Sequence, residues 1–174
     1  MRRTLYTGRV VALGLEQVTL PNGESIELEI VSHPGGAAIV ALDAGDRVCL
    51  LRQYRHAAGG WLWELPAGKL DPDEPPAATA RRELAEEAGV TAADWRELGR
   101  IVSSPGVFTE VVHLYLARGL APVAAAREPG EVFEVHWVRL DEAVGRALAG
   151  DIVDAKTVAG LLRARQATAG GGAG

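Results

Sequence analysis

The chain has 174 residues, of which 48% are hydrophobic and 24% charged, an ordinary composition for one globular domain with a substantial core. The formal net charge of −5 gives no electrostatic footprint for nucleic acid, and the single cysteine, Cys49, excludes a disulfide within the chain. No apolar run approaches ~20 residues, and no apolar signal segment follows the first arginines. We therefore expect a cytoplasmic protein with neither a membrane nor a nucleic acid as partner.

Residues 1–33 predict a small antiparallel β unit. Strands are expected at residues 9–13, 16–20 and 25–31, with a strong turn signal at Pro21, Asn22 and Gly23. Apolar and acidic side chains alternate in the third of these strands, as is typical of a half-buried strand. So short a sheet rarely stands alone, and we expect this unit to form a homodimer interface.

Residues 34–166 predict an α/β domain. Strands are expected at residues 37–42, 47–53, 95–102, 111–117 and 132–138, and helices at 77–88, 141–149 and 154–165. Asp141 gives the N-cap signal of the second helix. Strands on both sides of a central helix, with more helix at the end, predict an α/β sandwich. Residues 167–174 are expected to form a flexible tail.

The most informative segment spans residues 68–90. Its helix places Glu83, Glu86 and Glu87 in one turn, because residues three and four apart are neighbours on a helix. At an effective dielectric of about 20, two such carboxylates repel by about 3 kcal/mol. A hard cation such as Mg²⁺ offsets this repulsion and also holds substrate phosphates. The alternative is a solvated acidic face, which is common on exposed helices.

The wider spacing favours the metal site. The fixed positions of the pattern G-x5-E-x7-R-E-x-x-E-E-x-G are occupied by Gly68, Glu74, Arg82, Glu83, Glu86, Glu87 and Gly89. Seven fixed residues at average usage match by chance about 10⁻⁸ times per start position. The pattern is the Nudix box, and the chain resembles the Nudix hydrolases. That resemblance implies an α/β/α sandwich with a mixed sheet, preceded here by the N-terminal β unit.

The resemblance also implies a metal site. Glu83, Glu86 and Glu87 would bind Mg²⁺, for which Mn²⁺ can substitute, and the backbone carbonyl of Ala67 would be a further ligand. The residues that would support the loop–helix–loop are Gly68, Glu74 and Arg82. Arg82 lies four residues before Glu86, so it either orients that carboxylate or makes an ordinary surface pair.

Flanking segments resemble the ADP-ribose pyrophosphatases over residues 4–165. These segments are RQYR at residues 52–55, WLWELPAG at 61–68, SPG at 104–106, and the N-terminal β unit. The resemblance implies Mg²⁺-dependent hydrolysis of ADP-ribose, or of related ADP-sugars, to AMP and ribose 5-phosphate. The alternatives are another nucleoside diphosphate sugar, with GDP or UDP, and a non-catalytic nucleotide sensor. The three intact glutamates argue against the sensor.

Four residues outside the box are candidates for the site. Arg52 and Arg55 are expected to bind substrate, although Arg55 could instead serve the solubility of an edge strand. Glu64 either hydrogen-bonds the substrate or pairs with an arginine. Glu110 is the candidate that deprotonates or orients the attacking water, with Glu86 as the other candidate base.

Overall fold

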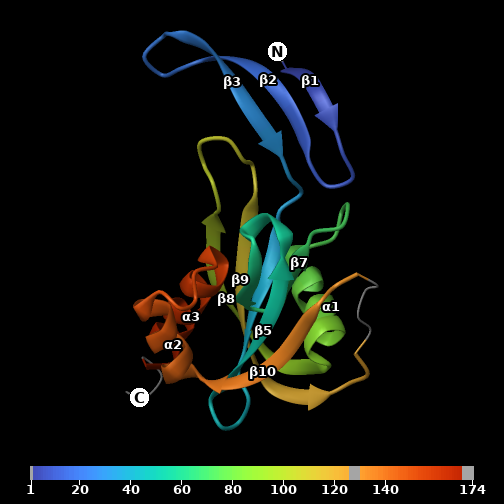
Figure 1. Ribbon diagram of the computed structural model, residues 1–174, viewed down its shortest axis with the longest axis vertical. Coiled ribbons are helices and arrows are strands. Elements are labelled where there is room, and N and C mark those ends of the chain that lie inside the picture. The colour runs from blue at the N-terminus through green and yellow to red at the C-terminus, as the bar shows by residue number, and fades with distance from the viewer. Residues whose placement is uncertain (1, 126–129, 170–174) are drawn as a thin grey trace.

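One buried strand, β4 (Gly36–Ala41), runs through the middle of the protein (Figure 1). The computed structural model describes residues 2–125 and 130–169. All of β4 is buried, as expected of a strand that is covered on both faces. It pairs parallel with β9 (Val111–Pro122) and antiparallel with the short β7 (Ala67–Lys69). Strand β8 (Val90–Val102) completes a mixed sheet in the order β7-β4-β9-β8.

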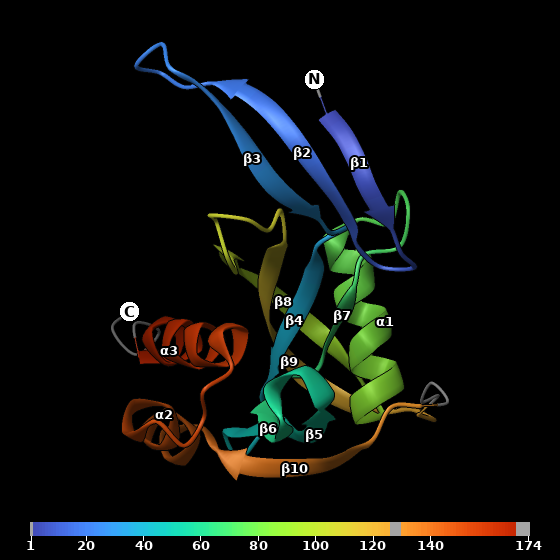
Figure 2. The ribbon, with the colours of Figure 1, turned by 45° about the horizontal axis from the view of Figure 1, so that its top comes forward.

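Helices cover both faces of this sheet. Successive side chains of a strand point to opposite faces. Ile39 and its odd-numbered neighbours in β4 therefore pack with α1 (Pro76–Ala88). Val40 and the even-numbered residues pack with α2 (Leu140–Ala149) and α3 (Ala155–Ala169). Figure 2 shows α1 on one side of the sheet and the other two helices on the opposite side. The predicted α/β/α sandwich with a mixed sheet is confirmed.

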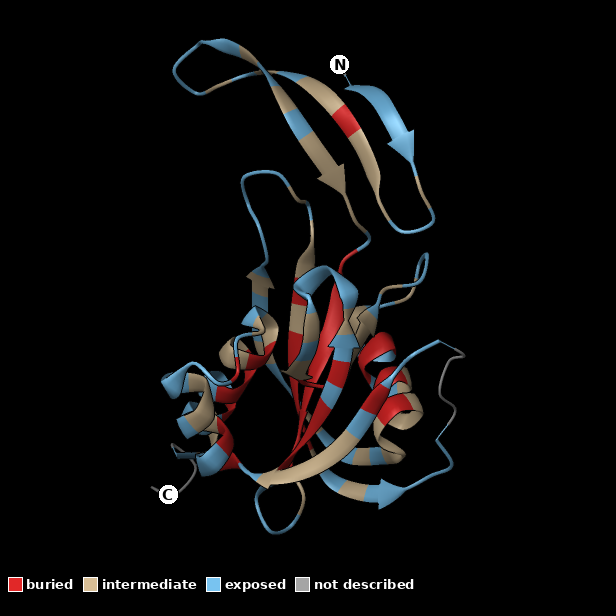
Figure 3. Ribbon diagram, in the orientation of Figure 1, coloured by how far each residue is buried: buried red, intermediate tan, exposed pale blue. Residues whose placement is uncertain are grey.

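A second sheet brings Arg55, at the end of β5 (Arg47–Arg55), to the same cavity as Gly36 and Ala37 at the start of β4. It is antiparallel, in the order β10-β5-β6, and consists of β5, β6 (Gly60–Glu64) and β10 (Phe133–Arg139). Residues His56–Ala58 form a short 3-10 turn between β5 and β6. In Figure 3 the buried positions concentrate where the two sheets and the helices meet.

The N-terminal strands β1 (Arg2–Thr7), β2 (Ala12–Thr19) and β3 (Ser25–Ser32) form their own antiparallel sheet, drawn in blue in Figure 1. The expected strand at residues 9–13 is wrong for residues 9–11, and residues 12 and 13 belong to β2. The chain turns there, and the Gly8 N–H donates to the Val11 carbonyl at 2.8 Å. The first strand lies earlier, in a segment whose residues are all exposed and therefore show no apolar alternation.

Other element boundaries also differ from the prediction. Strand β8 begins at residue 90 and β9 ends at 122, because the two pair along their whole length. Strands β6 and β7 were not predicted. Helix α2 begins one residue before Asp141, which therefore lies in the first turn. The negative charge of Asp141 interacts favourably there with the positive end of the helix dipole.

Helix α3 continues to residue 169, so the expected flexible tail is wrong for residues 167–169. Residues 170–174, the remainder of that predicted tail, lie outside the described residues. Within the described part of the chain, the helices are too short or too polar to cross a membrane.

The packing of α3 on the sheet gives a stability prediction. Leu161 is fully buried, whereas Leu162 on the same helix is 39% exposed. We expect Leu161→Ala to lower the free energy of unfolding by about 2–5 kcal/mol, because it leaves a cavity in the core. Leu162→Ala is the matched control and should change it by less than about 0.5–1 kcal/mol. Urea denaturation measures both, and equal losses would contradict this packing.

Candidate active site

The three box glutamates lie on the second half of α1. Pro76 occupies the first turn of this helix, and Gly89 ends it with a left-handed φ of 65° and an N–H donated to the Ala85 carbonyl. Glu83 and Glu87 are four residues apart and both face the sheet, at 9% and 2% exposure. Glu86, beside them on the helix, is half-buried. The helix therefore brings carboxylates into the protein at one place.

The backbone of β7 lies directly against these carboxylates. A Cβ atom on Gly68 would lie 1.7 Å from Glu83 Oε1, so only glycine fits there without a shift of strand or side chain. The Ala67 N–H donates to Glu87 Oε2 at 2.8 Å. The structure thus brings Ala67 and Gly68 together with the box glutamates.

Arg82 joins the box loop to the helix. Its Nη1 donates to Glu83 Oε1 at 2.6 Å and to Glu86 Oε2 at 3.1 Å. Its Nε and Nη2 donate to the two oxygens of Glu74, at 3.3 Å and 3.1 Å. Glu74 also accepts a hydrogen bond from the Thr79 hydroxyl at 2.7 Å. One guanidinium therefore orients two box carboxylates and fixes the loop that precedes them.

Burial changes the protonation of the cluster. Burial raises the pKa of Glu87 to about 8; the Ala67 N–H opposes this, and the negative charges of Glu83 and Glu131 add to it. Burial also raises the pKa of Glu83, against the attraction of Arg82. Glu87 therefore retains a proton near neutral pH, and a cation that binds it must displace this proton.

The donor set fits a hard divalent cation, because every side-chain donor is a carboxylate oxygen. Among residues 2–125 and 130–169, no group of three histidine, cysteine or acidic residues already converges as a metal cluster. The reason is visible in the contacts: Arg82 lies between Glu83 and Glu86, and Glu87 accepts the Ala67 N–H. The carboxylates of this cluster would repel one another if all were charged. Here the positive charge of Arg82 and the proton on Glu87 reduce this repulsion, as a bound cation would. The three-glutamate metal set stays a prediction.

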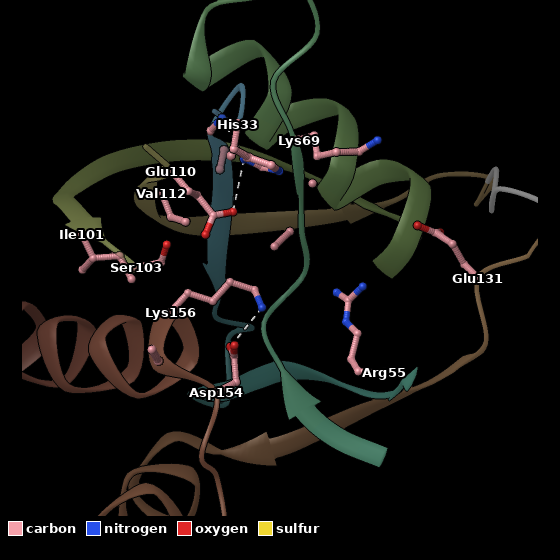
Figure 4. A pocket seen from close by; sticks show the side chains of 16 residues that line it. His33, Arg55, Lys69, Ile101, Ser103, Glu110, Val112, Glu131, Asp154 and Lys156 are labelled. Atoms are coloured by element: carbon pink, nitrogen blue, oxygen red, sulfur yellow. Dashed lines mark hydrogen bonds and ion pairs between the residues drawn. The ribbon is translucent and has the colours of Figure 1, made fainter. Parts of the chain in front are cut away.

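A cavity of about 400 Å³, drawn in Figure 4, adjoins the cluster, and its lining residues include Ala67 and Gly68. This volume lies within the usual range for small-molecule sites. Seven other lining residues carry acidic or basic side chains: His33, Arg55, Lys69, Glu110, Glu131, Asp154 and Lys156. The cavity is therefore suited to a polar, charged ligand.

Glu64 forms ion pairs with two basic side chains. Arg55 donates to its two oxygens from Nε at 2.7 Å and from Nη2 at 2.9 Å, and Lys156 Nζ donates to Oε2 at 2.6 Å. Burial pushes the pKa of Glu64 up, but the bonds from Arg55 and the charge of Lys156 outweigh it and hold the pKa below its ordinary value. Sequence reasoning missed Lys156, which lies 92 residues from Glu64 and in no motif.

Glu110 lies at the cavity wall, where its Oε1 is 3.4 Å from Nδ1 of His33, a residue of intermediate burial. The loop that carries it is tied to the end of β3. The Val31 N–H donates to the Val107 carbonyl at 2.7 Å, and the Thr109 N–H donates to the Val31 carbonyl at 3.0 Å. The site is thus attached to the N-terminal sheet through backbone hydrogen bonds.

Two further residues differ from the expectation. Glu131 lines the cavity and its charge acts on Glu83 and Glu87, but it sits in a polar segment that gave no sequence signal. Arg52 lies three residues from Arg55 in β5 and so on the opposite face. It pairs with Glu134 at 3.8 Å and lies over the Trp61 ring at 5.4 Å. The geometry does not bring Arg52 to the other site residues.

Comparison with known proteins agrees with this fold and site. Residues 32–161 match the model of the NUDIX domain. An ADP-ribose pyrophosphatase from Mycobacterium tuberculosis is 42% identical, over 96% of this chain and 82% of that protein. A methanol dehydrogenase activator from Bacillus methanolicus is 38% identical, over 88% and 84%, and an ADP-ribose pyrophosphatase from Bacillus subtilis 37% identical, over 90% and 85%.

The fold is also found in a solved structure described as an ADP compounds hydrolase. It superposes with a TM-score of 0.84 at 22% identity and covers 99% of this chain and 94% of that one. The chain belongs to the Nudix family. It is a Nudix hydrolase, and enzymes of this class generally need a divalent metal ion.

The close approach of β7 to α1 gives a second prediction. Gly68→Ala should lower the free energy of unfolding by about 1–3 kcal/mol, because the new methyl group overlaps the Glu83 carboxylate. Gly145→Ala in α2 is the control, since a Cβ there meets nothing within 4 Å. This control should gain up to about 1 kcal/mol from helix propensity. Urea denaturation separates the two, and a Gly68→Ala variant as stable as the original protein would refute the crowding.

The raised pKa of Glu87 gives a third prediction. In EDTA the free energy of unfolding should fall as pH rises from about 4.5 to about 8, because the folded protein keeps a proton that the unfolded chain has released. The contribution of the protonated Glu87 to the free energy of unfolding is fully present below this pH window and lost above it. Its slope is at most about 1.4 kcal/mol per pH unit.

Glu87→Gln removes this slope, because the amide does not titrate. Urea denaturation of both proteins at several pH values within the window gives the difference, which cancels the other titrating groups. Parallel pH profiles for the two proteins would contradict the raised pKa.

Proposed function

We propose that the chain hydrolyses the diphosphate bond of ADP-ribose or a related ADP-sugar, and that ADP-ribose yields AMP and ribose 5-phosphate. One observation carries this proposal: Ala67, which hydrogen-bonds Glu87, and Gly68, which lies against Glu83, also line a cavity with basic side chains. A phosphate group in that cavity would lie beside the basic side chains and near the two glutamates. The relatives named ADP-ribose pyrophosphatase support the choice of nucleotide.

We propose Mg²⁺ as the metal, with Mn²⁺ as a substitute. Glu83, Glu86, Glu87 and the carbonyl of Ala67 would hold it, since hard cations prefer such oxygen ligands. When bound, the metal neutralises charge on the diphosphate and polarises its phosphorus–oxygen bonds. Arg82 supports this set by fixing two of the three carboxylates.

The other steps fall to side chains at the cavity. Arg55 and Lys69 donate hydrogen bonds to phosphate oxygens. A glutamate takes a proton from the attacking water as the water oxygen bonds to one phosphorus and the bridging bond at that phosphorus breaks. Glu110 fills this role in our proposal. Glu86 is the other candidate base from the sequence, and Glu131 is a third, because it lines the same cavity as Glu110.

We also propose a cytoplasmic homodimer that pairs through residues 1–33, with residues 34–166 as the catalytic domain. The exposure of Leu5 at 49% and Tyr6 at 61% in β1 supports an interface on this sheet. The proposed substrate is a small nucleotide sugar, and neither nucleic acid nor membrane is a proposed partner.

Product analysis tests the activity. Purified protein with Mg²⁺ should release AMP and ribose 5-phosphate from ADP-ribose, and EDTA should abolish the reaction. Glu87→Gln should lower kcat by about 100-fold or more, because a misplaced or missing metal ligand removes transition-state stabilisation. GDP-mannose, UDP-glucose and NADH, run beside it, should react more slowly.

The outcomes separate the alternatives. Faster cleavage of another nucleotide sugar would move the specificity and retain the Nudix chemistry. Binding of ADP-ribose without any cleavage would favour a nucleotide sensor and defeat the proposal. Glu110→Gln and Glu131→Gln identify the base, because only the base variant should lose most of kcat with KM little changed.

A further inference from the structure

The start of α3 reaches the cavity beside the glutamate cluster. Asp154, Ala155 and Lys156 line this cavity, and Figure 4 shows Lys156 and Arg55 approaching it from different elements. The Lys156 side chain is only 17% exposed, and its Nζ lies 2.6 Å from Glu64 Oε2 and 3.0 Å from Asp154 Oδ2. Lys156 is therefore fixed at the cavity wall, although it lies far outside the Nudix box.

One buried carboxylate holds Lys156 and Arg55 together. Glu64 is 1% exposed and accepts Arg55 through both oxygens and Lys156 through one of them. Long basic side chains lose rotamer freedom when a ligand immobilises them, which weakens binding. Glu64 has already imposed this order on both side chains in the folded protein. The two cations are therefore preorganised for a ligand.

Both cations retain donors beyond these contacts. An ammonium group has three N–H donors and a guanidinium five. Within the described part of the chain, the contacts of Lys156 use two donors, toward Glu64 and Asp154, and those of Arg55 use two, toward Glu64. The donors that remain belong to residues of the cavity wall, where a ligand can accept them.

We propose that Lys156 is a substrate-binding residue that acts with Arg55 on the phosphate oxygens of a nucleoside diphosphate. This inference rests on the proposed function and extends it to a residue of α3. Charged donors bind phosphate more strongly than they bind sugar hydroxyls, and Lys69 adds a third cation to the same cavity. Arg55 offers a planar fork and Lys156 a compact charge. Glu64 is then a positioning residue that acts through both.

Binding of defined probes tests this assignment. Isothermal titration calorimetry of the full chain in EDTA would use ADP-ribose and inorganic diphosphate. Lys156→Met should raise Kd for both probes by about tenfold or more, because a charged donor is lost while Arg55 keeps Glu64 paired. Lys156→Arg should retain most of the affinity. In turnover assays KM should rise by a similar factor, with kcat changed much less.

Arg165→Met is the matched control. Arg165 lies on the same helix and makes an exposed pair with Asp141 at 3.2 Å, so its loss should leave both Kd values unchanged. Lys156→Gln, which keeps a donor toward Glu64, replaces Lys156→Met if that variant does not fold.

The outcomes are distinct. A lower Tm of Lys156→Met with unchanged Kd values would show a purely structural role and overturn the inference. A wild-type protein that binds neither probe would also overturn it. Diphosphate binding that depends on Lys156, in a protein that does not hydrolyse ADP-ribose, would support the inference and defeat the proposed function.

Discussion

The structure of the site depends on the contact between the backbone of β7 and the carboxylates of α1. Gly68 leaves room for Glu83 only because it has no side chain, and the Ala67 N–H meets Glu87. This contact docks the helix on the sheet and buries two acids at once. It also makes the same short strand a wall of the cavity. The position of the helix, the burial of the two acids and the shape of the cavity therefore all depend on the close approach of β7 to α1, which Gly68 permits.

Buried charge in this protein is balanced in two different ways. Around α1, Arg82 pairs with Glu83 and Glu86, and burial leaves Glu87 with a pKa of about 8. Around Glu64 two cations surround one acid, and the pKa of this acid is lowered. In the first group, one guanidinium and one retained proton balance three carboxylates. The second is fixed, because breaking a buried pair leaves an uncompensated charge at considerable cost. The two groups thus balance buried charge by different means in neighbouring parts of the protein.

The sequence predicted those contacts of the site that join residues close together in the chain, and it missed those that join distant segments. The box and its helix were predictable because their residues lie within one loop and one helix, where spacing determines geometry. Lys156 and Glu131 were not, because they reach the cavity from segments far along the chain that carry no motif. Arg52 was grouped with Arg55 by proximity in sequence, although strand alternation places the two on opposite faces. The first strand was missed because its exposed residues show no alternation.

The two backbone hydrogen bonds that join the Glu110 loop to β3 have a mechanical consequence. A loop attached only at its own ends can open by rotating a few bonds. This loop also shares the last rung of the N-terminal sheet at Val31 and Phe108, so it opens only by breaking that rung or by carrying the sheet with it. The position of Glu110 at the cavity wall is therefore coupled through backbone hydrogen bonds to the position of the N-terminal sheet.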